Sequence, residues 1–137
     1  MTTKYKSLLI CILLITGCNE DISILGTDIN SNGIRDDVDQ YINSQQATIA
    51  QKKSLSQAAI AITDTLTMTP KTHLNVATNL SNASSCLYSQ FTANEAHDYV
   101  LAMQDLVVNT NTREKAYNLY NTTNINGIPS PDGDGCI

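Results

Sequence analysis

Oxygen-bearing groups recur through residues 28–39 at a spacing suited to binding a cation. They occupy the first, third, fifth, seventh, ninth and twelfth positions of this stretch: Asp28, Asn30, Asn32, Ile34 through its backbone carbonyl, Asp36 and Asp39. Gly33 stands at the sixth position, where a tight turn requires a positive φ. Calcium takes about six to eight oxygen ligands, one of them commonly through water, as expected here for Asp36. These residues are therefore predicted to hold one calcium ion.

Other ions and a purely structural role are the alternatives for this stretch. The loop contains neither His nor Cys, which argues against zinc and copper. Magnesium prefers a smaller octahedral shell with several waters, so calcium fits better. An Asn- and Asp-rich turn that only caps the following helix is the remaining alternative. Such a turn does not require acids at both 36 and 39.

The stretch DINSNGIRDDVD resembles the calcium-binding loop of EF-hand proteins. It differs from that loop in three ways: no entering helix fits before it, Asp39 replaces a Glu, and Arg35 replaces the apolar residue that pairs two loops. It is therefore more similar to the single loop-and-helix units of dockerins and of thrombospondin type 3 repeats. Three carboxylates beside a helix favour a structural site at millimolar extracellular calcium, rather than a switch.

The first eighteen residues have the layout of a secretory signal. Lys4 and Lys6 precede the apolar run SLLICILLI, which is too short to span a membrane, and ITGC follows. This ending resembles the lipobox of bacterial lipoproteins, in which the chain is cut before the cysteine and lipid is attached to it. The resemblance implies a signal peptide over 1–17, a lipid such as palmitate on Cys18, and a tether over 18–27. The protein is then expected in the cell envelope, lipid-anchored to a membrane and facing the periplasm or the exterior.

The four cysteines separate into different roles. Cys11 leaves with the signal and Cys18 carries lipid, so Cys86 and Cys136 remain as one pair. In an oxidising compartment an isolated pair is most simply a disulfide. The alternative, a catalytic or metal-binding thiol, would need a nearby base or more ligands. A disulfide to the penultimate residue would pin the C-terminal tail to the body of the protein.

Apolar residues recur at helical spacing from Asp37 onward. The stretch 37–67 is predicted to form one bent helix or two, with a break at Asn43-Ser44. Thr69 is predicted to cap the next helix, with Pro70 at its first position and its end near residue 88.

Two further helices are predicted beyond residue 91. The run Thr92-Ala93-Asn94-Glu95 matches a capping box, and Phe91 is placed to staple it. Asn111 or Thr112 is expected to cap the last helix, which an irregular tail follows. Within that tail, residues 132–135 (DGDG) are expected to form a flexible acidic turn, the alternative being that they lend oxygens to the calcium ion.

The predicted fold class is all-α. No strand-like alternation is long enough to build a sheet. We expect a single domain over 28–137: a small bundle of four or five helices, preceded by the calcium-binding loop and followed by a disulfide-pinned C-terminal tail.

Charge and motif content narrow the possible functions. Thirteen acids against eight bases give a net charge of −5, which argues against nucleic acid and favours a cation or a basic partner. The sequence contains no recognisable catalytic set, so an enzyme is not expected. We expect a calcium-binding, membrane-anchored, extracytoplasmic lipoprotein that acts as a protein-binding or envelope structural module with an unknown partner. The alternative is a periplasmic immunity or inhibitor protein that blocks a toxic or lytic enzyme.

Overall fold

The computed structural model describes residues 23–123, 127, 130–131 and 133–137, and within them it contains five α-helices and no strand. The helices are α1 (Asp36–Ser44), α2 (Ile49–Leu66), α3 (His73–Gln90), α4 (Ala93–Val107) and α5 (Asn111–Thr122). This confirms the predicted all-α class. Among the described residues, no helix combines the length and the apolar character that a membrane span needs.

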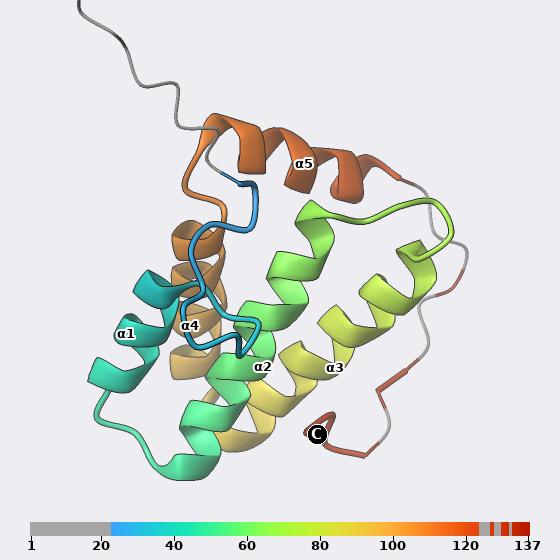
Figure 1. Cartoon of the computed structure of the whole chain (residues 1–137). Helices are drawn as coiled ribbons and strands as arrows, with labels where there is room; N and C mark the ends of the chain where they lie inside the picture. Colours follow the sequence, from blue (N-terminus) through green and yellow to red (C-terminus); the bar gives the residue numbers. More distant parts are fainter. Residues whose placement is uncertain (1–22, 124–126, 128–129, 132) are drawn as a thin grey trace, which may run out of the picture.

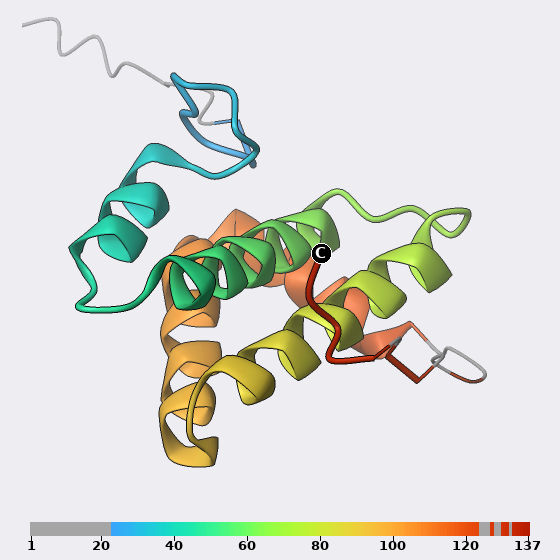
Figure 2. The ribbon, with the colours of Figure 1, turned by 90° about the horizontal axis from the view of Figure 1, so that it is seen from below.

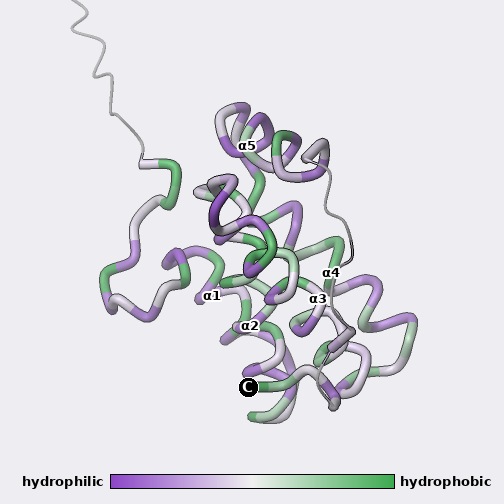
Figure 3. The backbone as a smooth tube through the Cα atoms, turned by 90° about the vertical axis from the view of Figure 1, so that its right-hand side faces the viewer, coloured by the Kyte–Doolittle hydropathy of each residue, from purple (hydrophilic) through white to green (hydrophobic). Residues whose placement is uncertain are grey.

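Helix α2 is the centre of the bundle. It contacts each of the other four helices, with α3 beside it and α5 across its C-terminal end (Figure 1). Hydrophilic and hydrophobic residues alternate around the helices, as expected when each buries one face (Figure 3). The loop before α1 lies on the α1 side of the bundle, away from the C-terminal end of the chain (Figure 2).

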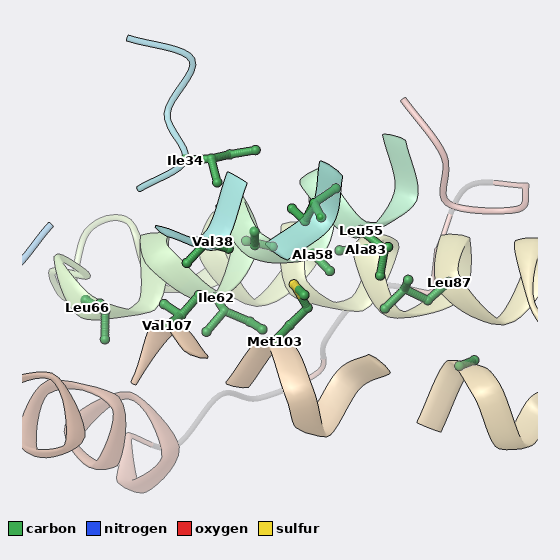
Figure 4. Close-up of a cluster of buried hydrophobic side chains, with 14 residues drawn as sticks. Ile34, Val38, Leu55, Ala58, Ile62, Leu66, Ala83, Leu87, Met103 and Val107 are labelled. Carbon is green, nitrogen blue, oxygen red and sulfur yellow. The ribbon is translucent and has the colours of Figure 1, made fainter. Parts of the chain in front are cut away.

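One hydrophobic core joins the loop to the helices. It takes side chains from the loop and from α1 to α4 (Figure 4), among them Ile34, Val38, Leu55, Ile62, Leu87, Met103 and Val107. The Ile34 side chain is only 4% exposed, although the three residues before it in the loop, Ser31–Gly33, are exposed. Burying a side chain of this size contributes about 2 kcal/mol, so the core itself holds the loop in place.

The break between the first two helices lies where the sequence predicted it. α1 ends at Ser44, and α2 begins at Ile49 after its N-cap, Thr48. The Thr48 hydroxyl accepts a hydrogen bond from the Gln51 backbone N–H, and the Gln51 side chain accepts one from the Thr48 N–H. This capping box fixes the start of α2, so the stretch 37–67 forms two helices.

The predicted capping box at the start of α4 is confirmed. Thr92 Oγ1 accepts a hydrogen bond from the Glu95 backbone N–H, and the Glu95 carboxylate accepts one from the Thr92 N–H. The Thr92 hydroxyl also donates to the Glu95 carboxylate at 2.6 Å, and this bond, together with the bond from the Thr92 N–H, lowers the pKa of Glu95. The Phe91 ring packs against Tyr99, with ring centroids 4.7 Å apart, and so fixes the angle at which the chain enters the helix.

Thr92→Ala is expected to destabilise the protein by about 1 kcal/mol, because it leaves the N–H groups of the first turn of α4 without their acceptor. Urea denaturation followed by circular dichroism measures the change. Thr78→Ala, the same substitution inside α3, is the matched control and is expected to change stability by less than about 0.5 kcal/mol. Equal effects of the two substitutions would contradict a capping role for Thr92.

The predicted start of the third helix was wrong by a few residues. α3 begins at His73 rather than at Pro70, because residues 69–72 close a turn of their own. In that turn the Thr72 N–H donates to the Thr69 carbonyl at 3.0 Å, and the Thr69 N–H donates to Thr72 Oγ1 at 3.0 Å. The threonine pair therefore satisfies its own backbone groups before the helix starts.

The last helix is capped one residue earlier than predicted. Thr110, rather than Asn111 or Thr112, accepts the hydrogen bond from the Arg113 backbone N–H, at 3.3 Å. Threonine and asparagine are both able to cap, so local sequence did not distinguish these three residues.

The end of the tail lies against α2 and α3 (Figure 2). Cys136 is disulfide-bonded to Cys86 of α3, which confirms the predicted bond. Gln57 of α2 also fixes the tail, because its Nε2 donates a hydrogen bond to the Gly135 carbonyl at 2.7 Å. The tail is thus fixed to both helices.

Candidate metal centre

The loop over residues 28–39 is closed by hydrogen bonds to the carboxylate of its first residue. Asp28 Oδ1 accepts from the Asn32 N–H at 3.2 Å, and Asp28 Oδ2 accepts from the Gly33 N–H at 2.9 Å. Gly33 has a φ of +83°, a conformation that side chains rarely adopt. The predicted turn at Gly33 is therefore present and folds the chain back over Asp28.

The two asparagines face the carboxylate at the far end of the loop. Asn30 Nδ2 and Asn32 Nδ2 each donate to Asp39 Oδ2, both at 3.0 Å. Their amide oxygens accept backbone N–H groups instead: Asn30 Oδ1 that of Asn32, and Asn32 Oδ1 that of Ile34. Side chains from the third, fifth and twelfth positions of the loop are thus brought together.

The ninth position lies at the base of the loop. Asp36 Oδ1 accepts from the Ile29 N–H at 3.0 Å, and the Asp36 N–H donates to the Thr27 carbonyl at 2.9 Å. These two bonds join the entry of the loop to the start of α1. The Asp36 carboxylate therefore orders the backbone, while its other oxygen accepts no hydrogen bond from the described residues.

The seventh position contributes an anchor and a free carbonyl. The Ile34 side chain is buried in the core, and its carbonyl accepts no hydrogen bond from the residues that the structure describes. Of the six predicted residues, Asp28, Asn30, Asn32 and Ile34 lie in the loop before α1, whereas Asp36 and Asp39 belong to the first turn of α1. In the described part of the chain, no group of three or more His, Cys, Asp or Glu side chains is arranged to hold a metal ion. Any ion here would depend on the asparagine and backbone oxygens as well.

Arg35 connects the loop to the C-terminal end of α4, a role that the sequence did not reveal. Its guanidinium pairs with Asp37, and it also donates to the carbonyls of Leu106 at 2.6 Å and Val107 at 3.3 Å. These carbonyls lie in the last turn of α4, where a cation is favoured. The hydrogen bond from Arg35 holds the pKa of Asp37 below its usual value.

A second arginine fixes the segment that leads into the loop. Arg113 is only 4% exposed, and it donates through Nε to the Ile24 carbonyl at 2.7 Å and through Nη1 to Asn109 Oδ1 at 2.6 Å. Burial lowers its pKa, as does the charge of Arg35 nearby. A Cβ at Gly26 would lie 2.3 Å from the Arg35 Cδ, so only glycine fits where the chain passes the two arginines. The one sequence feature that pointed to these contacts was Arg35, an arginine within an acidic loop.

The remaining predicted residues lie away from the loop or outside the described part of the chain. Cys18, the expected lipid attachment point, lies outside the described residues, as do the signal peptide and Asp132. Asp134 Oδ1 accepts the Cys136 N–H at 3.0 Å, in the tail segment that is fixed to α2 and α3. Asp134 therefore stabilises a turn of the tail.

Comparisons of the chain with protein-family models, with curated proteins and with solved structures find no match.

Proposed function

We propose that residues 28–39 bind one calcium ion in a non-enzymatic lipoprotein that is anchored through Cys18 to a membrane of the cell envelope. The domain would act there as a protein-binding or structural module. The observation that carries the proposal is the pair of hydrogen bonds that bring Asn30 and Asn32 onto the Asp39 carboxylate, across a loop closed at Gly33. A loop of this shape needs little reorganisation to surround an ion.

The donor set suits calcium. The ligands would be Asp28, Asn30, Asn32, the Ile34 carbonyl, Asp36 and Asp39, all of them oxygen donors. Each asparagine amide turns about a soft terminal torsion, so its oxygen can turn toward the ion in exchange for the backbone N–H that it accepts now. The ion would supply the positive charge that offsets the three carboxylates of one short loop.

The Cys86–Cys136 disulfide supports a location outside the cytoplasm, because such bonds persist in oxidising compartments. The lipobox-like sequence before Cys18 supports a lipid anchor, and the segment between Cys18 and the loop is short. The calcium loop would then lie close to the membrane surface, where extracellular calcium is available at millimolar concentration.

Calorimetric titration of the chain from residue 19 with calcium is expected to give saturable binding of one ion. Asp28→Ala and Asp39→Ala should each abolish it, because each removes a carboxylate that the loop is folded around. Calcium at about 100 times its Kd should also raise the stability by roughly 2.7 kcal/mol, measured by urea denaturation with and without chelator.

Asp105→Ala is the control for charge, because Asp105 is an exposed acid on α4 outside the loop. It should leave calcium binding unchanged. The absence of a saturable signal at millimolar calcium in the unsubstituted chain would reduce the loop to a turn that caps α1, and the calcium proposal would then be rejected.

The anchor is tested separately in the full chain. Mass spectrometry of protein purified from the envelope of an expressing bacterium is expected to find a lipid-modified N-terminus at Cys18. Cys18→Ser should instead give an unlipidated chain that washes off the membrane. A Cys18→Ser chain that still carries lipid would contradict the proposed attachment point.

A further inference from the structure

A small cavity lies where the tail meets α2 and α3, and no residue of the calcium loop lines it. Its volume is about 110 Å³, the space of about four water molecules at roughly 30 Å³ each. One part of its wall is apolar, formed by Ile60, Ala61 and Ile137. The other part is polar, formed chiefly by Asp64, Asn79 and Asn82.

The polar wall holds one carboxylate, Asp64, together with the amides of Asn79 and Asn82. Asn82 Oδ1 is shielded from solvent and has no hydrogen-bond partner among the described residues. Asp64 forms no ion pair there either, since the described residues contain one such pair, Arg35–Asp37. Burial raises the pKa of Asp64, and a hydrogen bond from Asn79 offsets part of that rise. The wall therefore carries one carboxylate and no positively charged side chain, beside amides that supply both N–H donors and carbonyl acceptors.

The tail forms a fixed edge of this cavity. The Cys86–Cys136 disulfide and Gln57 hold it, the latter accepting the Ile137 N–H at 3.3 Å through Oε1. A Cβ at Gly135 would lie 2.3 Å from the Asn82 carbonyl oxygen, so the tail backbone rests directly on α3 beside Asn82. The Ile137 side chain is 99% exposed and free to move aside. A ligand thus meets a rigid wall with one movable side chain at its lip.

We propose that this cavity binds a primary ammonium group on a short alkyl chain, either the side chain of a lysine from a partner protein or a free alkylamine. An ammonium group carries three N–H donors and a positive charge, which the Asp64 carboxylate, with no ion-pair partner among the described residues, and the Asn79 amide oxygen would accept. Its alkyl stem would lie along Ile60 and Ala61, as lysine stems commonly lie on apolar surface. A hard metal ion suits the site poorly, because one carboxylate beside an apolar wall cannot supply six oxygens. The net charge of −5 would attract such a cation.

The full chain titrated with n-butylammonium, followed by nuclear magnetic resonance, tests this inference. Saturable shifts are expected for the amide groups of Asn79 and Asn82, together with a fall in the measured pKa of Asp64. n-Butanol, which has the same stem and no charge, should give no saturable shift. A lysine-containing peptide with a blocked N-terminus forms the second arm: shifts at the same residues indicate a protein partner, and shifts with the amine alone indicate a small molecule.

Asp64→Asn keeps the shape of the side chain and is expected to weaken binding of n-butylammonium by about tenfold or more. Asp105→Asn makes the same change of charge on an exposed residue and should leave binding unchanged. Asn79→Asp adds a second carboxylate at an exposed position of the wall and should tighten binding, so the test does not depend on a loss of function alone. Binding that is equal in all three variants, or no saturable shift in the unsubstituted chain, would overturn the proposal.

Discussion

Removal of the Cys86–Cys136 disulfide is expected to lower the free energy of unfolding by about 4 kcal/mol. The bond joins residues 50 positions apart, and in the chain-entropy model a cross-link over a loop of that size restricts the unfolded chain by about this amount. Small domains are stable by only about 5–15 kcal/mol, so the loss is a large part of the total. Urea denaturation of the Cys86→Ala/Cys136→Ser double variant against the oxidised chain measures it.

The slope of the unfolding free energy against urea should also rise in the double variant, because an unfolded chain without the cross-link exposes more surface. Reduced wild-type protein is the matched control and should behave like the double variant. A loss of stability below about 1 kcal/mol would mean that the tail contacts, rather than the cross-link, carry the stability of this region. Hydrogen exchange of the tail amides distinguishes these two sources of stability. If the tail contacts carry the stability, the hydrogen bonds to Gln57 should still protect the tail amides in the double variant.

The helices were largely predictable from sequence because their signals are local. Thr92 and Glu95 form a capping box within four residues, and the break after Ser44 follows from a few polar residues in succession. The start at Pro70 and the cap at Asn111 or Thr112 were misplaced for the same reason. A threonine can cap a helix or close a turn, and the neighbouring residues decide which.

The turn of the loop was likewise predictable from sequence. The contacts that hold the loop against the helices were less so. Asp28 and Gly33 meet across five residues, so their spacing alone indicated the contact. Arg35 reaches carbonyls 71 and 72 residues away, and Arg113 reaches the Ile24 carbonyl 89 residues away. Contacts of that separation depend on how the helices pack, and no local pattern encodes them.

The buried side chain of Leu55 also depends on that packing, and Leu55→Ala is expected to destabilise the protein by about 3 kcal/mol. Leu55 is 0% exposed on α2, the helix that contacts every other helix, and it belongs to the same core cluster as Ile34 of the loop. The substitution removes apolar contacts and leaves a cavity that the surrounding helices refill only in part. Thermal unfolding should shift down by roughly 15 °C for a domain of this size.

Leu101→Ala on α4 provides the matched control, because the Leu101 side chain is 48% exposed and the substitution leaves no closed cavity. Its effect should stay below about 1 kcal/mol. If the two substitutions destabilised equally, α2 would not be the centre of the core, and the anchoring of the calcium loop through Ile34 would lose its basis. If Leu55→Ala alone is costly, the stability of the loop rests on the same core as the helices, and calcium would act on a site that folding has already shaped.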